Sequence, residues 1–87
     1  MSGAESTDNR IGTVGIIVED TSVVGEINSI LHTYADIIVG RLGIPYRARG
    51  VSIIALIVDG SMDTISAMTG KIGALPGVSV KTGVAKK

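Results

Sequence analysis

The sequence predicts an α+β domain of the ferredoxin-like class, with the order β-α-β-β-α-β, a four-stranded antiparallel sheet and two helices on one face. The main observation is an internal repeat: an apolar strand pattern, an acidic turn, an amphipathic helix pattern and a second strand pattern occur twice. The first series contains residues 16–20 and the second contains residues 56–60, about forty residues later. Composition agrees, since the apolar residues are mostly Ile, Val, Leu and Ala, whose β-branched members favour strands.

Length, charge and the absence of cysteine exclude several classes of protein. A chain of 87 residues has room for one small domain. Its formal net charge of zero argues against a free-standing nucleic-acid-binding protein held by long-range attraction. Without cysteine there is no thiolate nucleophile and no cysteine-ligated zinc or iron–sulfur centre, and we expect no cofactor.

The ends of the chain predict a cytoplasmic protein without membrane contact. Residues 1–9 are polar and lack the apolar segment of a signal peptide. No apolar run approaches the roughly 20 residues that a membrane-spanning helix needs. We therefore expect a disordered tail over residues 1–9, a single domain over residues 10–85 and a short polar end at residues 86–87.

The first half predicts a strand, a helix and a second strand. Alternating apolar residues indicate the strand over residues 11–19, and Asp20 and Ser22 then offer side-chain oxygens for a helix N-cap. A stripe with a helical period predicts the buried face of the helix: Val23, Val24, Ile27, Ile30, Leu31 and Tyr34. The next strand is expected over residues 37–42, with Pro45 ending regular pairing.

The second half repeats this series after a basic connection over residues 46–50. A strand is expected over residues 51–59, and Ser61 offers a cap for the helix that follows. The predicted buried face of this helix consists of Met62, Ile65, Met68, Thr69 and Ile72. Alternation along residues 78–84 predicts the last strand.

Small residues also form a stripe on the second predicted helix, at Ser66, Gly70 and Gly73. A glycine in a helix is less favourable than alanine by roughly 0.5–1 kcal/mol, so the two glycines require a reason. We expect close packing against the first helix; the alternatives are a subunit contact or room for a ligand.

The strand expected over residues 51–59 is apolar on both of its faces. These faces consist of Ile53, Ala55 and Ile57 on one side and of Ile54, Leu56 and Val58 on the other. Two helices cover only one side of a four-stranded sheet, so the other side should be polar if it meets water. Because it is apolar, we predict a homo-oligomer, either a dimer or a tetramer, in which a second copy covers this face. The alternative is a monomer whose sheet is only mildly apolar.

His32 is the one histidine, and it lies beside the apolar stripe of its helix rather than within it. One histidine without cysteine cannot complete a metal site within a single chain, so we expect no metal. His32 is the one candidate ligand, through a symmetric assembly and with Asp36 as its partner; a solvated surface histidine is the alternative. The acidic residues at the strand-to-helix turns suit helix N-termini and do not indicate a catalytic carboxylate pair.

Basic residues and a tyrosine cluster around the connection between the second and third expected strands: Arg41, Tyr46, Arg47 and Arg49. Such a cluster suits an anionic ligand, because guanidinium groups bind carboxylates and phosphates through paired hydrogen bonds. The alternative is a charged hairpin that protects a strand edge. Direct RNA binding is not expected, because it would need aromatic residues on the central strands and the sequence has no Phe or Trp.

Six segments carry a resemblance to a known family: residues 17–20 (IVED), 30–32 (ILH), 36–41 (DIIVGR), 43–46 (GIPY), 63–73 (DTISAMTGKIG) and 76–82 (PGVSVKT). They resemble the iron-only hydrogenase system regulators, and the resemblance extends from Arg10 to Thr82. That family is similar to ACT-type regulatory domains and to the ligand-sensing domain of nickel-responsive repressors. The resemblance implies a small oligomeric domain that senses a small molecule or a metal.

The chain departs from those relatives at two points. Nickel-responsive repressors use several histidines and a cysteine, whereas this chain has His32 alone, and none of its segments supplies their DNA-binding ribbon-helix-helix. ACT domains usually have glycine in the first strand–helix loop, where this chain has Asp20 and Ser22. The expected ligand site lies at a subunit interface and draws on Asp20, Ser22, His32, Arg41, Tyr46 and Arg47.

The leading interpretation is a non-enzymatic, ACT-like regulatory domain that self-associates through its sheet and binds a small molecule between subunits, in the regulation of an iron-only hydrogenase system. The alternative is an adaptor that docks a partner protein by its apolar face or basic loop, without a ligand of its own. A third interpretation is an enzyme with His32 as general base. No direct contact with nucleic acid or membrane is expected.

Overall fold

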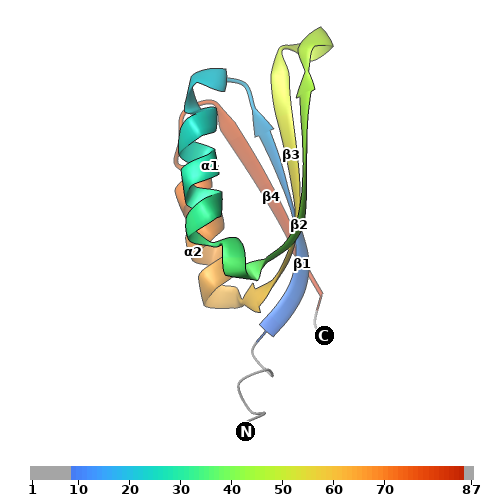
Figure 1. Ribbon diagram of the computed structural model, residues 1–87, viewed down its shortest axis with the longest axis vertical. Helices are drawn as coiled ribbons and strands as arrows, with labels where there is room; N and C mark the ends of the chain where they lie inside the picture. The colour runs from blue at the N-terminus through green and yellow to red at the C-terminus, as the bar shows by residue number, and fades with distance from the viewer. Residues whose placement is uncertain (1–8, 86–87) are drawn as a thin grey trace, which may run out of the picture.

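The computed structural model describes residues 9–85, and these residues form the predicted ferredoxin-like fold (Figure 1). Its regular elements are, in chain order, β1 (Asn9–Val18), α1 (Val24–Thr33), β2 (Ile38–Tyr46), β3 (Val51–Ser61), α2 (Met62–Gly73) and β4 (Val78–Val84). Short 3₁₀ turns precede α1, precede β2 and join β2 to β3. The predicted tail, apart from Asn9, and the predicted polar end at residues 86–87 lie outside the described residues.

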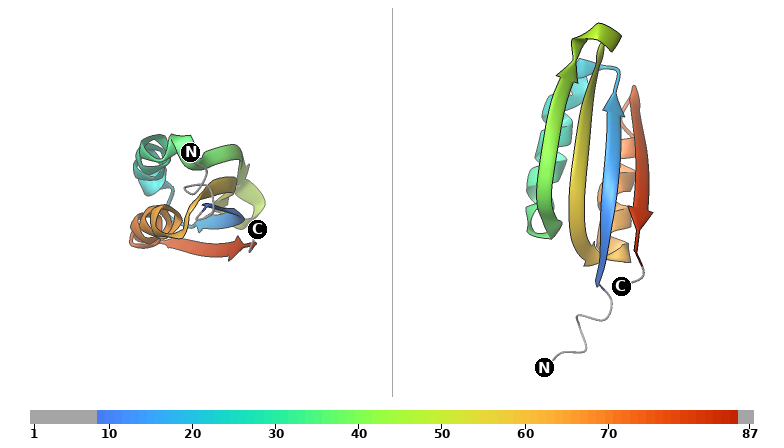
Figure 2. Two further views of the ribbon diagram at one scale, coloured as in Figure 1. Left: turned by 90° about the horizontal axis from the view of Figure 1, so that it is seen from below. Right: turned by 90° about the vertical axis from the view of Figure 1, so that its right-hand side faces the viewer.

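All four strands form one antiparallel sheet in the order β2-β3-β1-β4. Both helices pack on one face of this sheet, and no other part of residues 9–85 covers the opposite face (Figure 2). The central strands β1 and β3 pair along their whole length, with Ile16 opposite Ile54 near the middle. This topology follows from the repeat, because each β-α-β half returns its helix to the same side of the sheet.

The core lies between the sheet and the helices and consists of aliphatic side chains and one methionine. The buried residues are Val14, Ile16, Val18, Val23, Ile27, Leu31, Ile37, Ile54, Leu56, Val58, Ile65, Met68 and Ile72. Burying one such side chain contributes about 1.5–3 kcal/mol, so this layer is the main driving force for folding. The predicted stripes of the two helices are confirmed at their centres.

Two predictions about α2 are wrong. Met62 is expected in the buried stripe, but its side chain is 38% exposed, because the packed stripe begins one turn later at Ile65. Gly70 is expected to pack closely against α1, but nothing lies within 4 Å of the position that a Cβ would take. Gly70 therefore faces open space and is not a helix–helix contact.

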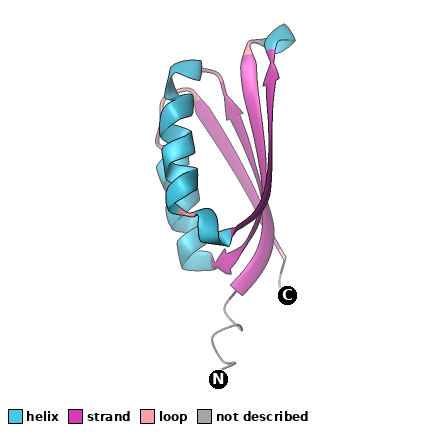
Figure 3. Cartoon of the chain, in the orientation of Figure 1, coloured by secondary structure: helices cyan, strands magenta, loops and turns pink. Residues whose placement is uncertain are grey.

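β2 is longer than predicted. Regular pairing is expected to end before Pro45, but β2 continues to Tyr46, and Pro45 lies opposite Ser52 of β3. An edge strand tolerates proline because one side of its backbone has no partner strand. The β2–β3 hairpin therefore projects beyond the helices and ends in the 3₁₀ turn Arg47–Arg49 and in Gly50, whose φ of 67° closes the turn (Figure 3).

Both predicted helix starts have their capping hydrogen bonds. Asp20 Oδ1 accepts the backbone N–H of Ser22 at 3.0 Å and its hydroxyl at 2.6 Å, in the turn before α1. Ser61 Oγ accepts the backbone N–H of Thr64 at 3.1 Å, at the start of α2. These bonds satisfy donors that a helix start leaves without an intrahelical partner. Among residues 9–85, no helix has the length and hydrophobicity needed to cross a membrane.

Candidate functional site

The uncovered face of the sheet is the first candidate site, and we call it the open face. Strand alternation places on it Ile11, Thr13, Gly15 and Ile17 of β1, Gly40, Leu42, Ile44 and Tyr46 of β2, Val51, Ile53, Ala55, Ile57 and Asp59 of β3, and Ser79, Lys81 and Gly83 of β4. Of the eight large apolar side chains exposed among the described residues, six lie on this face. Its charged residues are Asp59, toward the end of β3, and Lys81, which lies opposite Gly15 on the edge strand β4. The open-face side chains of the central strands are uncharged over residues 11–17 and 51–57.

The open face is not flat. Gly15 and Ala55 lie opposite each other at its centre, and nothing lies within 4 Å of the position of a Gly15 Cβ. A hollow of about 330 Å³ extends from Ala55 to Gly40, beside the projecting side chains of Leu42 and Ile57. These two side chains are 59% and 44% exposed. Projections and hollows therefore alternate on one apolar surface. Such a surface can interlock with a complementary surface on a partner, as close packing at an interface requires.

The second candidate site lies between α1 and the edge strand β2, and we call it the α1–β2 cleft. It has a volume of about 440 Å³ and is lined by Asn28, Leu31, His32, Ala35, Ile38, Val39, Gly40 and Arg41. Asn28 and His32 share one side of α1 because they are four residues apart. The pairing of β2 with β3 shifts between Ile38 and Gly40, so Val39 is an extra residue in the strand that forms the opposite wall.

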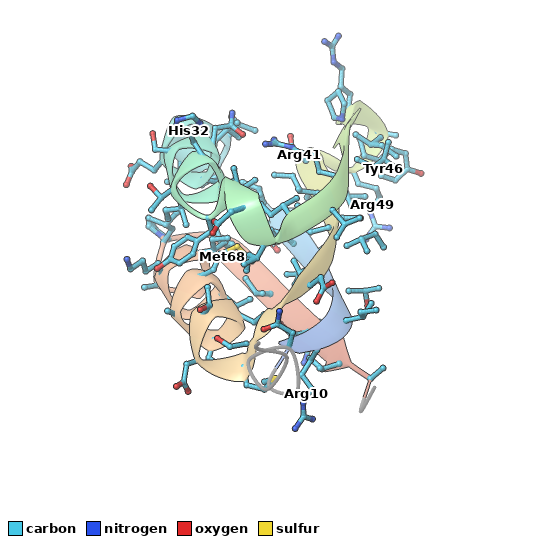
Figure 4. The ribbon with its side chains drawn as sticks, turned by 60° about the horizontal axis from the view of Figure 1, so that its bottom comes forward. Arg10, His32, Arg41, Tyr46, Arg49 and Met68 are labelled. Atoms are coloured by element: carbon cyan, nitrogen blue, oxygen red, sulfur yellow. The ribbon has the colours of Figure 1, made fainter. Side chains whose placement is uncertain are left out.

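Arg41 projects from β2 toward α1 (Figure 4). It lies on the helix-facing side of the sheet, opposite the buried Leu56, and its Nη2 donates to Asn28 Oδ1 over 3.0 Å. A guanidinium has five N–H donors, so this bond leaves most of them for a ligand. No carboxylate lines the cleft among the described residues. The α1–β2 cleft therefore offers a positive charge and hydrogen-bond donors to a molecule that enters it.

Of the six predicted site residues, His32 and Arg41 share this cleft, and the other four lie elsewhere. Asp20 and Ser22 are at the opposite end of α1, and a helix of 10 residues places its ends roughly 15 Å apart. Tyr46 lies on the open face, and Arg47 lies in the hairpin turn. A ligand site that unites all six between subunits stays a prediction.

The carboxylate of Asp20 has a structural role. The side-chain hydrogen bond from Ser22, followed by the backbone hydrogen bond from the same residue, lowers the pKa of Asp20. This carboxylate is thereby committed to the turn before α1. Within residues 9–85, no three His, Cys, Asp or Glu side chains are close enough together to hold a metal ion.

Asn28 is missing from the predicted site, although the structure makes it the partner of Arg41. Its spacing from His32 is the signal that would have found it, because residues four apart on a helix share one side. The sequence does not show that Arg41 approaches α1, because this approach depends on the register of β2 in the sheet.

The fold and these two features define a small ferredoxin-like domain with an uncovered apolar sheet face and a cationic cleft at the edge of the sheet. The family described as "TM1266-like: Iron-only hydrogenase system regulator, putative" matches residues 10–82. The chain belongs to this family, which confirms the resemblance carried by its six segments.

Solved structures that are similar to the chain include the following two. The structure of the uncharacterized protein TM1266 from Thermotoga maritima is 34% identical over 90% of this chain and 99% of that chain, with a TM-score of 0.85. The crystal structure of an unknown protein from Galdieria sulphuraria is 16% identical over 91% of this chain and 46% of that chain, with a TM-score of 0.61. The second similarity shows the fold alone. No curated protein matches the chain.

Proposed function

We propose that this chain is a cytoplasmic, non-enzymatic regulatory domain of an iron-only hydrogenase system, which self-associates through its open face and senses a small molecule. The observation that carries the proposal is the open face, an apolar surface that no element among residues 9–85 covers. Extended exposed apolar patches are characteristic of interaction sites. The regulatory role comes from the family to which the chain belongs.

A second copy of the chain is the occupant that suits the open face. Gly15 and Ala55 lie opposite each other and have small side chains, so they form a low area on the open face. The next pair of residues on the same face is Thr13 and Ile57, so Ile57 projects beside this low area. If two copies pack face to face and are shifted by one such pair along the strands, the projecting Ile57 of each copy lies over the low area of the other copy. The open-face side chains of β1 and β3 at this contact are uncharged, so the packing buries no unpaired charge between them. Lys81 lies opposite Gly15 but on the edge strand β4, where its long side chain can keep the ammonium in water. The product is a dimer or, through a further contact, a tetramer.

The α1–β2 cleft supports the sensing part of the proposal. Its volume of about 440 Å³ lies within the roughly 300–1,000 Å³ that is common for small-molecule pockets. Gly40 lines this cleft and also belongs to the open face, where it borders the hollow beside Ile57. A ligand in the cleft would contact the strand that forms the proposed subunit interface, which provides a route from binding to assembly.

The surroundings of the histidine favour a non-catalytic role. His32 shares its cleft with the amide of Asn28 and the guanidinium of Arg41, and no Ser or Thr lines that cleft among the described residues. A general base needs the proton-bearing group within hydrogen-bond reach, and the cleft itself supplies no hydroxyl nucleophile.

An adaptor without its own ligand is the second candidate function, and the hairpin tip favours it. Arg47 and Arg49 lie in the exposed turn that projects beyond the helices, next to the exposed Tyr46. A basic, projecting tip suits an acidic partner protein, since opposite charges guide association.

Light scattering coupled to size-exclusion chromatography tests the assembly. We expect the full chain to have the mass of two or four protomers, and Ile57→Lys to have the mass of one, because packing would bury the new charge. Met62→Lys is the matched control, since Met62 is similarly exposed but belongs to α2. A wild-type chain that stays monomeric at all concentrations would contradict the proposal.

A thermal-shift screen tests the sensing function against free amino acids, organic acids, nucleotides and divalent metals. A ligand at 100 times its dissociation constant stabilises a protein by about 2.7 kcal/mol. Each kcal/mol raises the midpoint of a domain this small by about 4–8 °C, so a true ligand should give a shift of about 10 °C or more. An intact oligomer with no response to any compound would favour the adaptor.

A further inference from the structure

The α1–β2 cleft also restricts the chemical class of its ligand. We propose that it binds a small aliphatic carboxylic acid, with the carboxylate on Arg41 and Asn28 and the carbon chain on the apolar wall of the cleft. This inference rests on the sensing function proposed above and names the ligand class for it.

The donors of the cleft are arranged for an anion. Asn28 turns its Oδ1 toward Arg41 at 3.0 Å, so its NH₂ group, on the other side of the same amide, is directed away from that bond. The guanidinium keeps further N–H donors beside it. His32 lines the same cleft one turn along α1 and adds a ring nitrogen. Two or three donors from different elements can thus meet the oxygens of one carboxylate, which guanidinium groups bind in a bidentate manner.

The charge of the cleft selects the same class. Arg41 carries a permanent positive charge, and its observed partner is an uncharged amide rather than a carboxylate. No acidic side chain lines the cleft among residues 9–85. Because the amide does not neutralise the guanidinium, the positive charge of Arg41 stays available to attract an anionic ligand. The same charge repels amines and metal ions. One arginine is too little for the several charges of a nucleotide polyphosphate, so a singly charged anion fits best.

The apolar part of the cleft distinguishes a carboxylic acid from a bare anion such as phosphate. Ala35, Ile38 and Val39 provide carbon surface in the lining of the cleft. A second, mostly apolar hollow of about 180 Å³ lies between α1 and β2 and shares Asn28 and Arg41 with the cleft. The Asn28–Arg41 hydrogen bond therefore has carbon surface on both sides, and an acid with a short hydrocarbon chain would bury that chain while its carboxylate stays on the donors.

The test is a titration of the ¹⁵N-labelled full chain, followed by the ¹H–¹⁵N NMR spectrum. The probes are hexanoate, acetate, inorganic phosphate and hexylamine, which vary the chain and the charge separately. We expect saturable shifts with hexanoate at the amides of Asn28, His32 and residues 38–41, and weaker binding of acetate and phosphate. Hexylamine, with the same chain and the opposite charge, should not compete.

Two substitutions and one control locate the carboxylate. Arg41→Gln removes the charge and should weaken hexanoate binding at least about tenfold, the range for a hydrogen bond to a charged group. Asn28→Asp leaves the arginine in place but gives it a carboxylate partner within the protein, so it should have the same effect. Arg49→Gln removes an equal charge from the hairpin turn and should bind hexanoate as the wild type does.

The outcomes separate this inference from the sensing function on which it rests. Shifts outside the cleft, equal binding of hexylamine, or unchanged affinity in both variants would overturn the carboxylate site. If the thermal-shift screen then finds a ligand of another class, the sensing function stands and the ligand class is wrong. If no compound of any class binds, both are wrong. Saturable binding of hexanoate that both variants lose and the control keeps would establish the site.

Discussion

Replacing Gly15 by valine separates the stability of the protomer from the stability of the assembly. Gly15 lies at the centre of the open face, opposite Ala55, with nothing within 4 Å of the position of its Cβ. Its φ is not positive, so a branched side chain suits the backbone. In the free protomer, the valine should be tolerated or should stabilise the strand, since a glycine inside a strand is less favourable than alanine by roughly 0.5–1 kcal/mol.

In the proposed face-to-face assembly the same valine fills the low area that receives the partner. Overpacking of a close-packed contact costs about 1–3 kcal/mol, and a two-fold interface contains the substitution twice, which gives about 2–6 kcal/mol. Because about 1.4 kcal/mol corresponds to a tenfold change, the dissociation constant should rise at least about 30-fold. The variant should therefore be as stable as the wild type or more so when dilute, yet largely dissociated where the wild type is assembled.

Sedimentation velocity over a concentration series, with urea unfolding at the lowest concentration, measures both quantities. The matched control is Gly43→Val, because Gly43 also has nothing within 4 Å of a Cβ position but lies opposite the helix-facing Ile54. This control should assemble like the wild type. If Gly15→Val assembles normally, or if both variants dissociate equally, the open face is not the contact and the reasoning fails.

Three further predictions concern the protomer. An L residue at positive φ costs roughly 1–2 kcal/mol of stability. Gly77→Ala should cost more than this, because the added Cβ would lie 2.8 Å from Asp20 Cβ. Gly50→Ala has a similar φ but no such contact, so it should lose only the cost of the backbone conformation; urea unfolding measures both variants. Asp20→Asn should remove a pH-dependent contribution to stability: the lowered pKa of Asp20 stabilises the folded state above pH 4, and this stabilisation is lost as pH falls through the folded-state value. Thermal midpoints of the two proteins from pH 6 to about pH 2 should therefore converge on acidification, and a constant difference would contradict the assignment. Met68→Ala should cost about 2–5 kcal/mol in urea unfolding, since Met68 is fully buried; a loss below about 1 kcal/mol would show that the core closes around the gap.

The fold and the apolar open face were predictable because they depend on local patterns. A period of two places Ile53, Ala55 and Ile57 on one side of a strand wherever that strand lies, and a period of 3.6 does the same for the buried residues of each helix. The caps at Asp20 and Ser61 are equally local, since each bonds a backbone N–H two or three residues away. The local rule that proline ends a strand fails at Pro45, because β2 is an edge strand and continues to Tyr46.

Periodicity acts within one element, so it was enough to predict the class of fold, most of the core and the presence of a second apolar face. Which polar residues form a site depends instead on how the elements pack against one another. Arg41 reaches Asn28, 13 residues earlier in the chain, because β2 is the edge strand beside α1 and its register turns Arg41 toward the helix. The same strand continues to Tyr46, five residues on, and therefore turns that side chain to the open face. Successive strand residues alternate between the two faces, so neighbours in sequence were separated while residues of different elements were brought together.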